Sequence, residues 1–289
     1  MPLLLALAAA AMWGAGDFMG GIAARLWSAF RVAFVGQLIG LALVVAALPF
    51  LPGEAIRADL LWGAAAGVFG GLGALFLYRG LAEGQMNVVA PITAVTAAVL
   101  PAGAGLALGE TPEPAASAGV ALAIGAVALL GMQQHPHSED EAAPTGRILS
   151  PRGLGTALVA GIGFGLFFTL IAQTSVESGL WPLLSNRLVS CTILGAILVV
   201  WSLRRNSPEG KGGAWLATAS GTLDMTANVA YLLAAQRGSL ALVAVLASLY
   251  PAGTVLLSRF VLKEPLGKLH AAGLVLALIA IVLITGYGA

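Results

Sequence analysis

Long apolar runs, each about as long as a membrane-spanning helix, make up most of the chain. An α-helix needs about 20 mainly apolar residues to cross the hydrocarbon core of a bilayer. The short breaks between the runs carry charge, proline and glycine, which favour turns, and the alternating segments of a membrane β-barrel are missing. The pattern predicts an all-α integral membrane protein with ten transmembrane helices, at Leu3–Ala24, Ala29–Phe50, Leu60–Leu81, Met86–Leu108, Pro114–Met132, Gly153–Thr174, Trp181–Leu203, Ala214–Ala235, Ser239–Leu262 and Leu266–Tyr287.

One connection is long and polar, the segment Gln133–Ser150 near the middle of the chain. It predicts a solvated linker between a first domain, residues 1–132, and a second domain, residues 151–289. His135 and His137 stand in it as H-x-H, and imidazole is a common metal ligand. We favour a flexible acidic linker over a metal clip here.

The two domains are similar to each other at a constant offset of 154 residues. The offset pairs Gly67 with Gly221 and Glu110 with Glu264, and the glutamate pair carries most weight because charges are rare in this chain. Five spans per copy is an odd number, so the second copy enters the bilayer from the opposite side. Two inverted five-helix repeats around a central cavity are typical of secondary transporters, whose substrate site lies between the repeats near the midplane.

The composition agrees with a chain that has little soluble part. Apolar residues make up 59% of it and charged residues 9%, whereas soluble domains average about 25% charged. The net charge is +1 without a basic run, so nucleic acid is not an expected partner. Cys191 is the one cysteine, and Cys/His metal spacings are missing, so we expect no metal, cofactor or internal disulfide.

The positive charges are divided unevenly between the two sets of loops. Loops after the odd-numbered spans hold eleven Lys and Arg residues, and the alternate loops hold three, Arg57, Arg187 and Arg237. Because cytoplasmic loops carry the positive excess, this bias predicts that both termini lie outside, in the periplasm. The high ratio of Arg to Lys is typical of a GC-rich bacterial genome, so the expected location is the bacterial inner membrane.

Two acidic residues lie inside predicted spans. An aspartate at the centre of a membrane helix costs about 2.5–3.5 kcal/mol on insertion scales, so it normally faces a cavity or a partner. Asp224, Asn228 and Tyr231 are spaced i, i+4, i+7 and share one helix face. We interpret this stripe as the lining of a substrate cavity; the alternative is hydrogen bonding between helices, which stabilises membrane bundles.

The second acidic residue, Asp17, follows Trp13 by one helical turn. Helix 1 would then present an aromatic ring and a carboxylate on one face of the cavity. The alternative is that Trp13 packs against its neighbours while Asp17 pairs with Arg25 or Arg31 at the membrane edge.

Three further aromatic residues are candidates for the cavity. Phe164 and Phe168 are one turn apart in the sixth span, although aromatic stripes at this spacing are usually core packing. Tyr78 precedes Arg79 at the end of the third span, where an interfacial aromatic belt is the alternative.

Prolines and glycines indicate how the helices bend and pack. Pro91 and Pro251 lie within the fourth and ninth spans, where each would remove a backbone hydrogen bond; we interpret them as joints for gating, with fixed kinks as the alternative. Gly67 and Gly71 form a small-xxx-small pair that favours close helix contact. Glu110 stands before the fifth span and is expected to cap the N-terminus of that helix.

Several segments resemble one known family. The second half contains Gly238-Ser-Leu-Ala-Leu-Val-Ala-Val-Leu-Ala-Ser-Leu-Tyr-Pro251, then Thr254-Val-Leu-Leu257 and Lys263-Glu-Pro265; the first half contains Ala90-Pro-Ile-Thr93 and Gly109-Glu-Thr111. Together with Trp13-Gly14 and Arg31, these segments resemble the EamA-type drug/metabolite transporter superfamily, and most closely its bacterial YddG-type exporters of amino acids and related metabolites. The resemblance implies a ten-helix fold with a central cavity, alternating access and export from the cytoplasm.

Other functions have less support. A membrane-embedded enzyme would have to use Asp17 and Asp224 as an aspartyl pair, without a flanking pattern that supports it, and neither a channel filter nor a Walker motif is present. We therefore expect a transporter of small molecules and no enzyme, with a multidrug exporter without an amino-acid role as an alternative. Protons carried by Asp17 or Asp224 and facilitated exchange are equally open energy sources, and the sequence does not indicate an oligomeric state.

Overall fold

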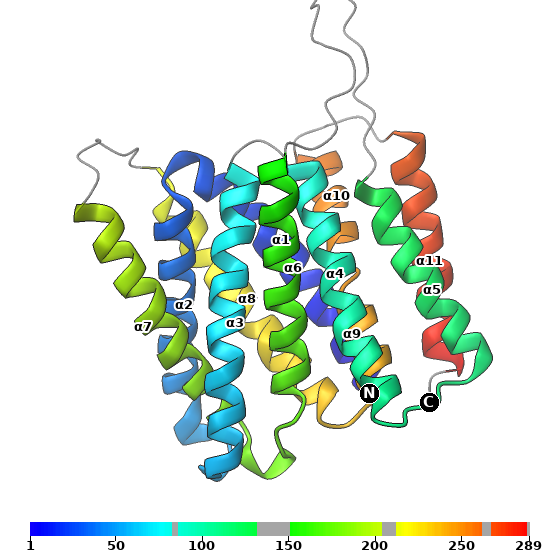
Figure 1. Cartoon of the computed structure of the whole chain (residues 1–289), viewed down its shortest axis with the longest axis horizontal. Helices are drawn as coiled ribbons and strands as arrows, with labels where there is room; N and C mark the ends of the chain where they lie inside the picture. The colour runs from blue at the N-terminus through cyan, green and yellow to red at the C-terminus, as the bar shows by residue number, and fades with distance from the viewer. Residues whose placement is uncertain (83–85, 132–150, 204–211, 262–266, 288–289) are drawn as a thin grey trace, which may run out of the picture.

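The computed structural model describes residues 1–82, 86–131, 151–203, 212–261 and 267–287, and the regular elements in these ranges are helices (Figure 1). The predicted linker with His135 and His137, and Glu264 of the repeat pair, lie outside the described residues. The helices are α1 (Pro2–Leu26), α2 (Ala29–Ala47), α3 (Arg57–Ala82), α4 (Met86–Ala107), α5 (Pro114–Gly131), α6 (Pro151–Ile171), α7 (Trp181–Leu203), α8 (Ala214–Ala235), α9 (Leu240–Ala247), α10 (Tyr250–Val261) and α11 (Lys268–Tyr287), with short 3-10 helices at Leu48–Phe50 and Val176–Ser178.

Eight stretches within the described residues are helices long and apolar enough to cross a membrane, and α9 with α10 counts as one of them. The apolar part of α5, Pro114–Leu130, is shorter than these spans. α8 is long enough but is not among the eight, because Asp224, Asn228 and its hydroxyl side chains lower its mean hydropathy. The protein is thus a multi-pass membrane protein, while the number ten remains a prediction.

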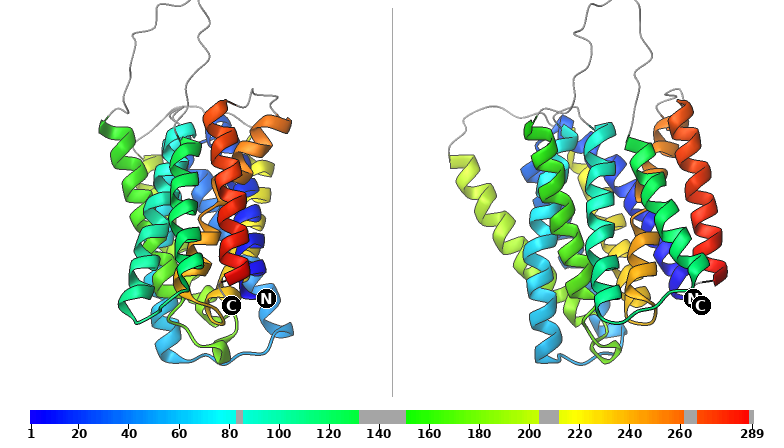
Figure 2. Two further views of the ribbon diagram at one scale, coloured as in Figure 1. Left: turned by 90° about the vertical axis from the view of Figure 1, so that its right-hand side faces the viewer. Right: turned by 45° about the vertical axis from the view of Figure 1, so that its right-hand side comes forward.

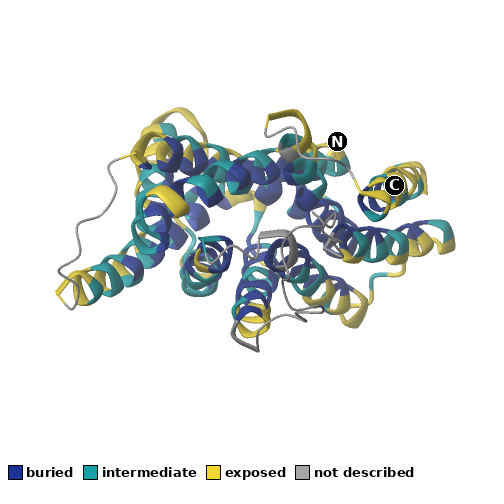
Figure 3. Ribbon diagram, turned by 90° about the horizontal axis from the view of Figure 1, so that it is seen from above, coloured by how far each residue is buried: buried dark blue, intermediate teal, exposed yellow. Residues whose placement is uncertain are grey.

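The helices of the two halves pack against each other. α1 lies along α8, α3 packs on α6 and α7, and α4 packs on α6 and α9, while α5 and α11 form a pair at one edge (Figures 1 and 2). All residues of α9 are buried. Seen from above, the exposed positions lie on the outside of the bundle (Figure 3), and many are large and apolar, such as Leu278 and Val282. A bundle with this outer surface is suited to lipid rather than to water.

Both ends of the chain lie at the same end of the bundle, which we call the termini end (Figures 1 and 2). α1, α3, α5, α7 and α9 begin at the termini end, and α2, α4, α6 and α8 begin at the opposite end. The connections from α2 to α3, α6 to α7 and α8 to α9 therefore meet at the termini end.

Glycines of α3 allow α7 to approach closely. A Cβ added at Gly67 would stand 2.4 Å from the backbone oxygen of Asn186, and one added at Gly71 would stand 2.9 Å from Cβ of Ser190. A Cβ added at Gly63, one turn earlier, would stand 2.1 Å from the backbone oxygen of Pro182. The predicted close-packing surface is therefore confirmed, and it places α7 directly on α3.

The two prolines predicted as joints differ in position. Pro91 lies inside α4, as expected. Pro251 does not lie within a continuous helix: α9 ends at Ala247, and Pro251 is in the first turn of α10. A missing N–H costs nothing in a first turn, where such groups have no partner in the helix. The ninth span is therefore two helices with a break just before Pro251, rather than one helix with a proline in its interior, and the gating role of Pro251 stays a prediction.

Candidate functional site

A narrow cavity lies between α1, α2, α3, α6, α7 and α8, and Tyr250 at the start of α10 also lines it. Its volume is about 50 Å³, which holds only a few water molecules, since each needs roughly 10–15 Å³ in this measure. A metabolite can bind here only if the walls move apart. The cavity is lined by seven of the eight residues predicted for it: Trp13, Asp17, Tyr78, Phe164, Phe168, Asp224 and Asn228.

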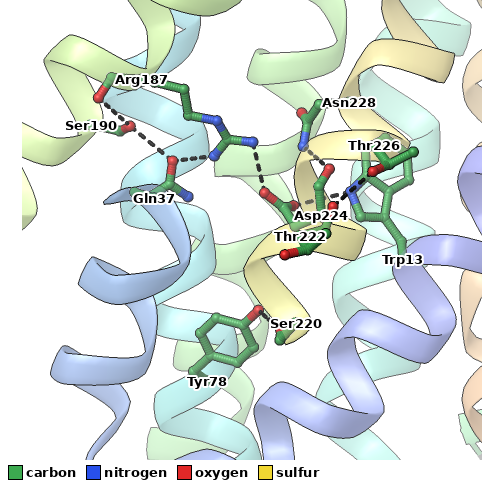
Figure 4. A network of polar contacts seen from close by, with 10 residues as sticks. All are labelled: Trp13, Gln37, Tyr78, Arg187, Ser190, Ser220, Thr222, Asp224, Thr226 and Asn228. Carbon is green, nitrogen blue, oxygen red and sulfur yellow. Dashed lines mark hydrogen bonds and ion pairs between the residues drawn. The ribbon is translucent and has the colours of Figure 1, made fainter. Parts of the chain in front are cut away.

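Asp224 of α8 joins three helices in the wall of this cavity (Figure 4). Its Oδ1 accepts a hydrogen bond from Trp13 Nε1 of α1 at 3.2 Å, and its Oδ2 accepts one from Arg187 Nη2 of α7 at 2.7 Å. Asn228, one turn further on, donates from Nδ2 to the backbone carbonyl of Asp224 at 2.6 Å. The aspartate is therefore held by a cation and an indole that come from different helices.

Arg187 continues the network to α2. Its side chain is only 3% exposed, and Nη1 donates to Gln37 Oε1, which also accepts from Ser190 Oγ at 2.9 Å. Its Nε has no hydrogen-bond partner within the described residues. Gly40 leaves room for the guanidinium, because a Cβ at Gly40 would stand 2.9 Å from Nε.

Arg187 is not among the residues predicted for the cavity, because its place near the start of a span makes it resemble a loop charge. Arg187 lies six residues inside an apolar run, and a charge at such a position normally has a partner or faces a cavity. That rule, applied to Arg187 as it was to Asp224, would have drawn attention to the pair. Without Arg187 the loop bias becomes eleven to two, which strengthens the predicted orientation.

Asp17 is placed differently from Asp224. It lines the cavity and is partly exposed there, and it makes no hydrogen bond or ion pair with any residue that the structure describes. The alternative pairing with Arg25 or Arg31 is therefore wrong for this structure. Two carboxylates and one guanidinium line the cavity, so one carboxylate lacks a compensating charge.

Tyr78 lies in the cavity wall rather than in an interfacial belt. It is buried, and its hydroxyl shares a hydrogen bond with Ser220 Oγ at 3.1 Å. Ser220 in turn donates to the backbone carbonyl of Gly16 at 2.8 Å. Tyr78 thus connects α3 to both α8 and α1, one turn of α8 away from Asp224 (Figure 4).

Aromatic rings pack beneath the polar network. The centroid of the Trp13 ring lies 5.2 Å from that of Phe168 and 5.7 Å from that of Tyr231, and the Phe168 and Tyr231 centroids are 4.7 Å apart. Tyr231 is fully buried, donates to the backbone carbonyl of Phe168 at 3.3 Å and does not line the cavity. Tyr231 shares a face of α8 with Asp224 but is buried behind the rings that line the cavity. The prediction that it lines the cavity is therefore corrected: Tyr231 packs against Trp13 and Phe168 and supports them.

Glu110 connects the two halves at the termini end. Its carboxylate accepts hydrogen bonds from Ser239 Oγ at 2.7 Å, from Leu240 N at 2.8 Å and from Ala241 N at 3.0 Å. It therefore caps α9, where unpaired N–H groups and the helix dipole favour a carboxylate. The predicted role of Glu110 as a helix cap is therefore correct, but the helix that it caps is α9 and not the next helix, α5.

Asp59 makes a similar connection, although it was not among the residues predicted to have a role. It accepts hydrogen bonds from Ser175 N at 3.0 Å, from Ser175 Oγ at 2.5 Å and from Ser178 Oγ, all in the connection between α6 and α7. Gln236 at the end of α8 donates to the backbone carbonyl of Ser175 at 2.7 Å. At the termini end, the loops of the second half are thus tied to α3 and to one another. A wider recess of about 820 Å³ lies at the same end, beside Glu110 and Arg237.

Comparison with known proteins gives one family and one fold. The sequence profile of the EamA-like transporter family matches residues 1–132 and 151–286. None of the curated proteins matches the chain. A solved structure described as "Crystal structure of protein" is similar with a TM-score of 0.69 and 19% sequence identity, covering 99% of this chain and 97% of that chain. At this identity the likeness shows the fold alone.

Proposed function

Because the chain belongs to the EamA-like transporter family, whose members carry small metabolites across membranes, we propose that it exports amino acids. The proposal places it among the YddG-type exporters, in the bacterial inner membrane, with neutral and aromatic amino acids as the favoured substrates. Export would proceed by alternating access, from the cytoplasm to the side on which both termini lie.

The observation that carries the proposal is the chemistry of the cavity wall. Asp17 has no hydrogen-bond or ion-pair partner in the described part of the chain, and an unpaired charge at membrane depth is costly, so a cationic group or a proton is favoured beside it. Arg187 provides a cation for an acid group, and the rings of Trp13, Phe164 and Phe168 provide apolar contact. Ammonium, carboxylate and an apolar side chain are the parts of a neutral or aromatic amino acid.

Alternating access is supported by the narrow cavity and by the contacts at the termini end. Glu110 and Asp59 bind segments of the second half there, so this end would have to release these contacts for a substrate to leave. Packing also supports two inverted halves of five helices, 1–132 and 151–289, joined by the linker 133–150. If the halves are exchanged, the pair α1 and α8 becomes the pair α6 and α3, and both pairs are in contact.

Transport into proteoliposomes tests this function. We expect counterflow of a labelled neutral amino acid with the wild type. Asp224→Ala should lose at least tenfold, about 1.4 kcal/mol, because Arg187 and Trp13 lose the carboxylate that holds them when no substrate is bound. Tyr231→Ala should lose transport in part, because it removes the support of Trp13 and Phe168. Glu113→Ala, at an exposed position, is the control and should transport normally. Normal transport by both Asp224→Ala and Tyr231→Ala would refute the assignment of the site, and transport of drugs but not of amino acids would favour a multidrug exporter.

Proton coupling is proposed for Asp17. A carboxyl group that holds a proton in the empty cavity and exchanges it for a substrate cation would make the protein an antiporter. Asp224, Arg187, Tyr78 and Tyr250 are the charged and titratable groups that line the cavity with it. We expect an imposed pH gradient across the vesicle membrane to accelerate transport by the wild type and not by Asp17→Asn. An equal rate with and without the gradient in the wild type would indicate facilitated exchange instead.

A further inference from the structure

We propose that Arg187 is the residue that selects substrates with a carboxylate, and that it does so by exchanging its partner: the substrate carboxylate replaces Asp224 on the guanidinium, while the substrate ammonium binds Asp17. The inference rests on the proposed function and adds to it the identity of the two charged contacts and the bond that must break for binding.

The ion pair is built so that one partner stays and the other can leave. The Arg187 side chain is 3% exposed and donates a hydrogen bond to Gln37. Its guanidinium fits against Gly40, where a larger residue would leave no room. The Asp224 side chain is 28% exposed, so its carboxylate can be reached from the cavity. A ligand that competes for this pair would therefore displace Asp224 and leave Arg187 where it is.

The space available requires such an exchange. A cavity of about 50 Å³ cannot take an amino acid beside an intact network. Loss of the Asp224 contact without a replacement would leave a buried guanidinium uncompensated, which is strongly unfavourable. A substrate carboxylate restores the charge balance of Arg187, because carboxylate and guanidinium match in geometry as well as in charge.

The position of Asp17 suits the ammonium group of the same substrate. Asp224 Oδ2 faces Arg187, and its Oδ1 faces the indole of Trp13. Asp17 lies one turn after Trp13 on the same face of α1. A substrate carboxylate in the place of the Asp224 carboxylate would therefore carry its own ammonium on the side of α1, toward Asp17, which has no ion-pair partner among the described residues.

Three probes that share a phenyl group test the carboxylate contact and the ammonium contact separately. They are L-phenylalanine, which has both charges, phenethylamine, which lacks the carboxylate, and 3-phenylpropionate, which lacks the ammonium. Binding is measured on the purified full chain by isothermal titration. The wild type should prefer L-phenylalanine to either analogue. Arg187→Gln should abolish the preference over phenethylamine, and Asp17→Asn should abolish the preference over 3-phenylpropionate. Arg237→Gln removes an equal charge outside the cavity and should leave all three affinities unchanged.

Asp224→Asn gives the decisive result, and it does not depend on the folding of the arginine variant. If Asp224 competes with the substrate for Arg187, its neutralisation should tighten binding of 3-phenylpropionate on the order of tenfold, about 1.4 kcal/mol. A purely structural ion pair predicts weaker or unchanged binding, and that outcome would overturn the exchange. If the wild type binds L-phenylalanine but Asp224→Asn gains no affinity for the acid, the inference fails while the proposed function stands. If the wild type binds and transports none of the three probes, both fail.

Discussion

Replacement of Arg187 by leucine is expected to destabilise the protein by about 3–5 kcal/mol, which is the usual cost of removing one partner from a buried ion pair. The cost arises because Asp224 then keeps a charge at membrane depth and, within the described residues, retains only Trp13 Nε1 as a side-chain partner. Gln37 also loses the guanidinium donor to its Oε1, and keeps only the hydrogen bond from Ser190 Oγ among the described residues. The free energy of unfolding, measured by denaturation in mixed micelles, gives the size of the effect.

The double variant Arg187→Leu/Asp224→Leu separates loss of the charge pair from loss of packing. Replacement of both partners by apolar residues is often neutral or stabilising, so the double variant should be more stable than either single variant, although it should not transport. The two residues contact each other, so their effects should not add. Additive losses in the double variant would mean that the pair contributes through packing alone.

Gly67→Ala is expected to have the second large effect. The new Cβ would stand 2.4 Å from the backbone oxygen of Asn186, which a backbone group cannot avoid unless α7 moves away from α3. Overpacking of this kind costs about 1–3 kcal/mol or more. Since Asn186 precedes Arg187, the same movement would shift the guanidinium, so transport should fall together with the melting temperature.

The matched control is Gly125→Ala in α5. A Cβ at Gly125 meets nothing within 4 Å, and alanine favours a helix over glycine by about 0.5–1 kcal/mol. This variant should be as stable as the wild type or slightly more stable, with normal transport. Equal stability of the Gly67 and Gly125 variants would contradict the tight contact between α3 and α7.

Features that depend on neighbours along one helix could be predicted from the sequence. Asp224 and Asn228 share a face because the helical repeat places residues i and i+4 together. Trp13 and Asp17 line the cavity for the same reason, and the pair Gly67 and Gly71 correctly indicated a contact surface. Tyr231 shows the limit of this reasoning, because a shared face of a helix does not say how deeply each side chain lies beneath it.

Features that depend on two helices could not be predicted in this way. Arg187 and Asp224 are 37 residues apart, and Trp13 and Asp224 are 211 apart. Their meeting depends on the register in which α1, α7 and α8 pack. Glu110 caps α9 rather than the helix that follows it for the same reason: the nearest unpaired N–H groups in space are far away in the chain.

By itself, the sequence determined that this protein lies in a membrane, that it is helical, and which of its few polar residues have to be explained at membrane depth. Hydrophobicity and the helical repeat are local properties, and the cost of burying a charge applies wherever the charge stands. Only the tertiary structure decided that Arg187 pairs with Asp224 and that Asp17 has no ion-pair partner among the residues that the structure describes. That decision depends on packing between helices, which sets distances of a few ångströms between residues that the chain keeps far apart.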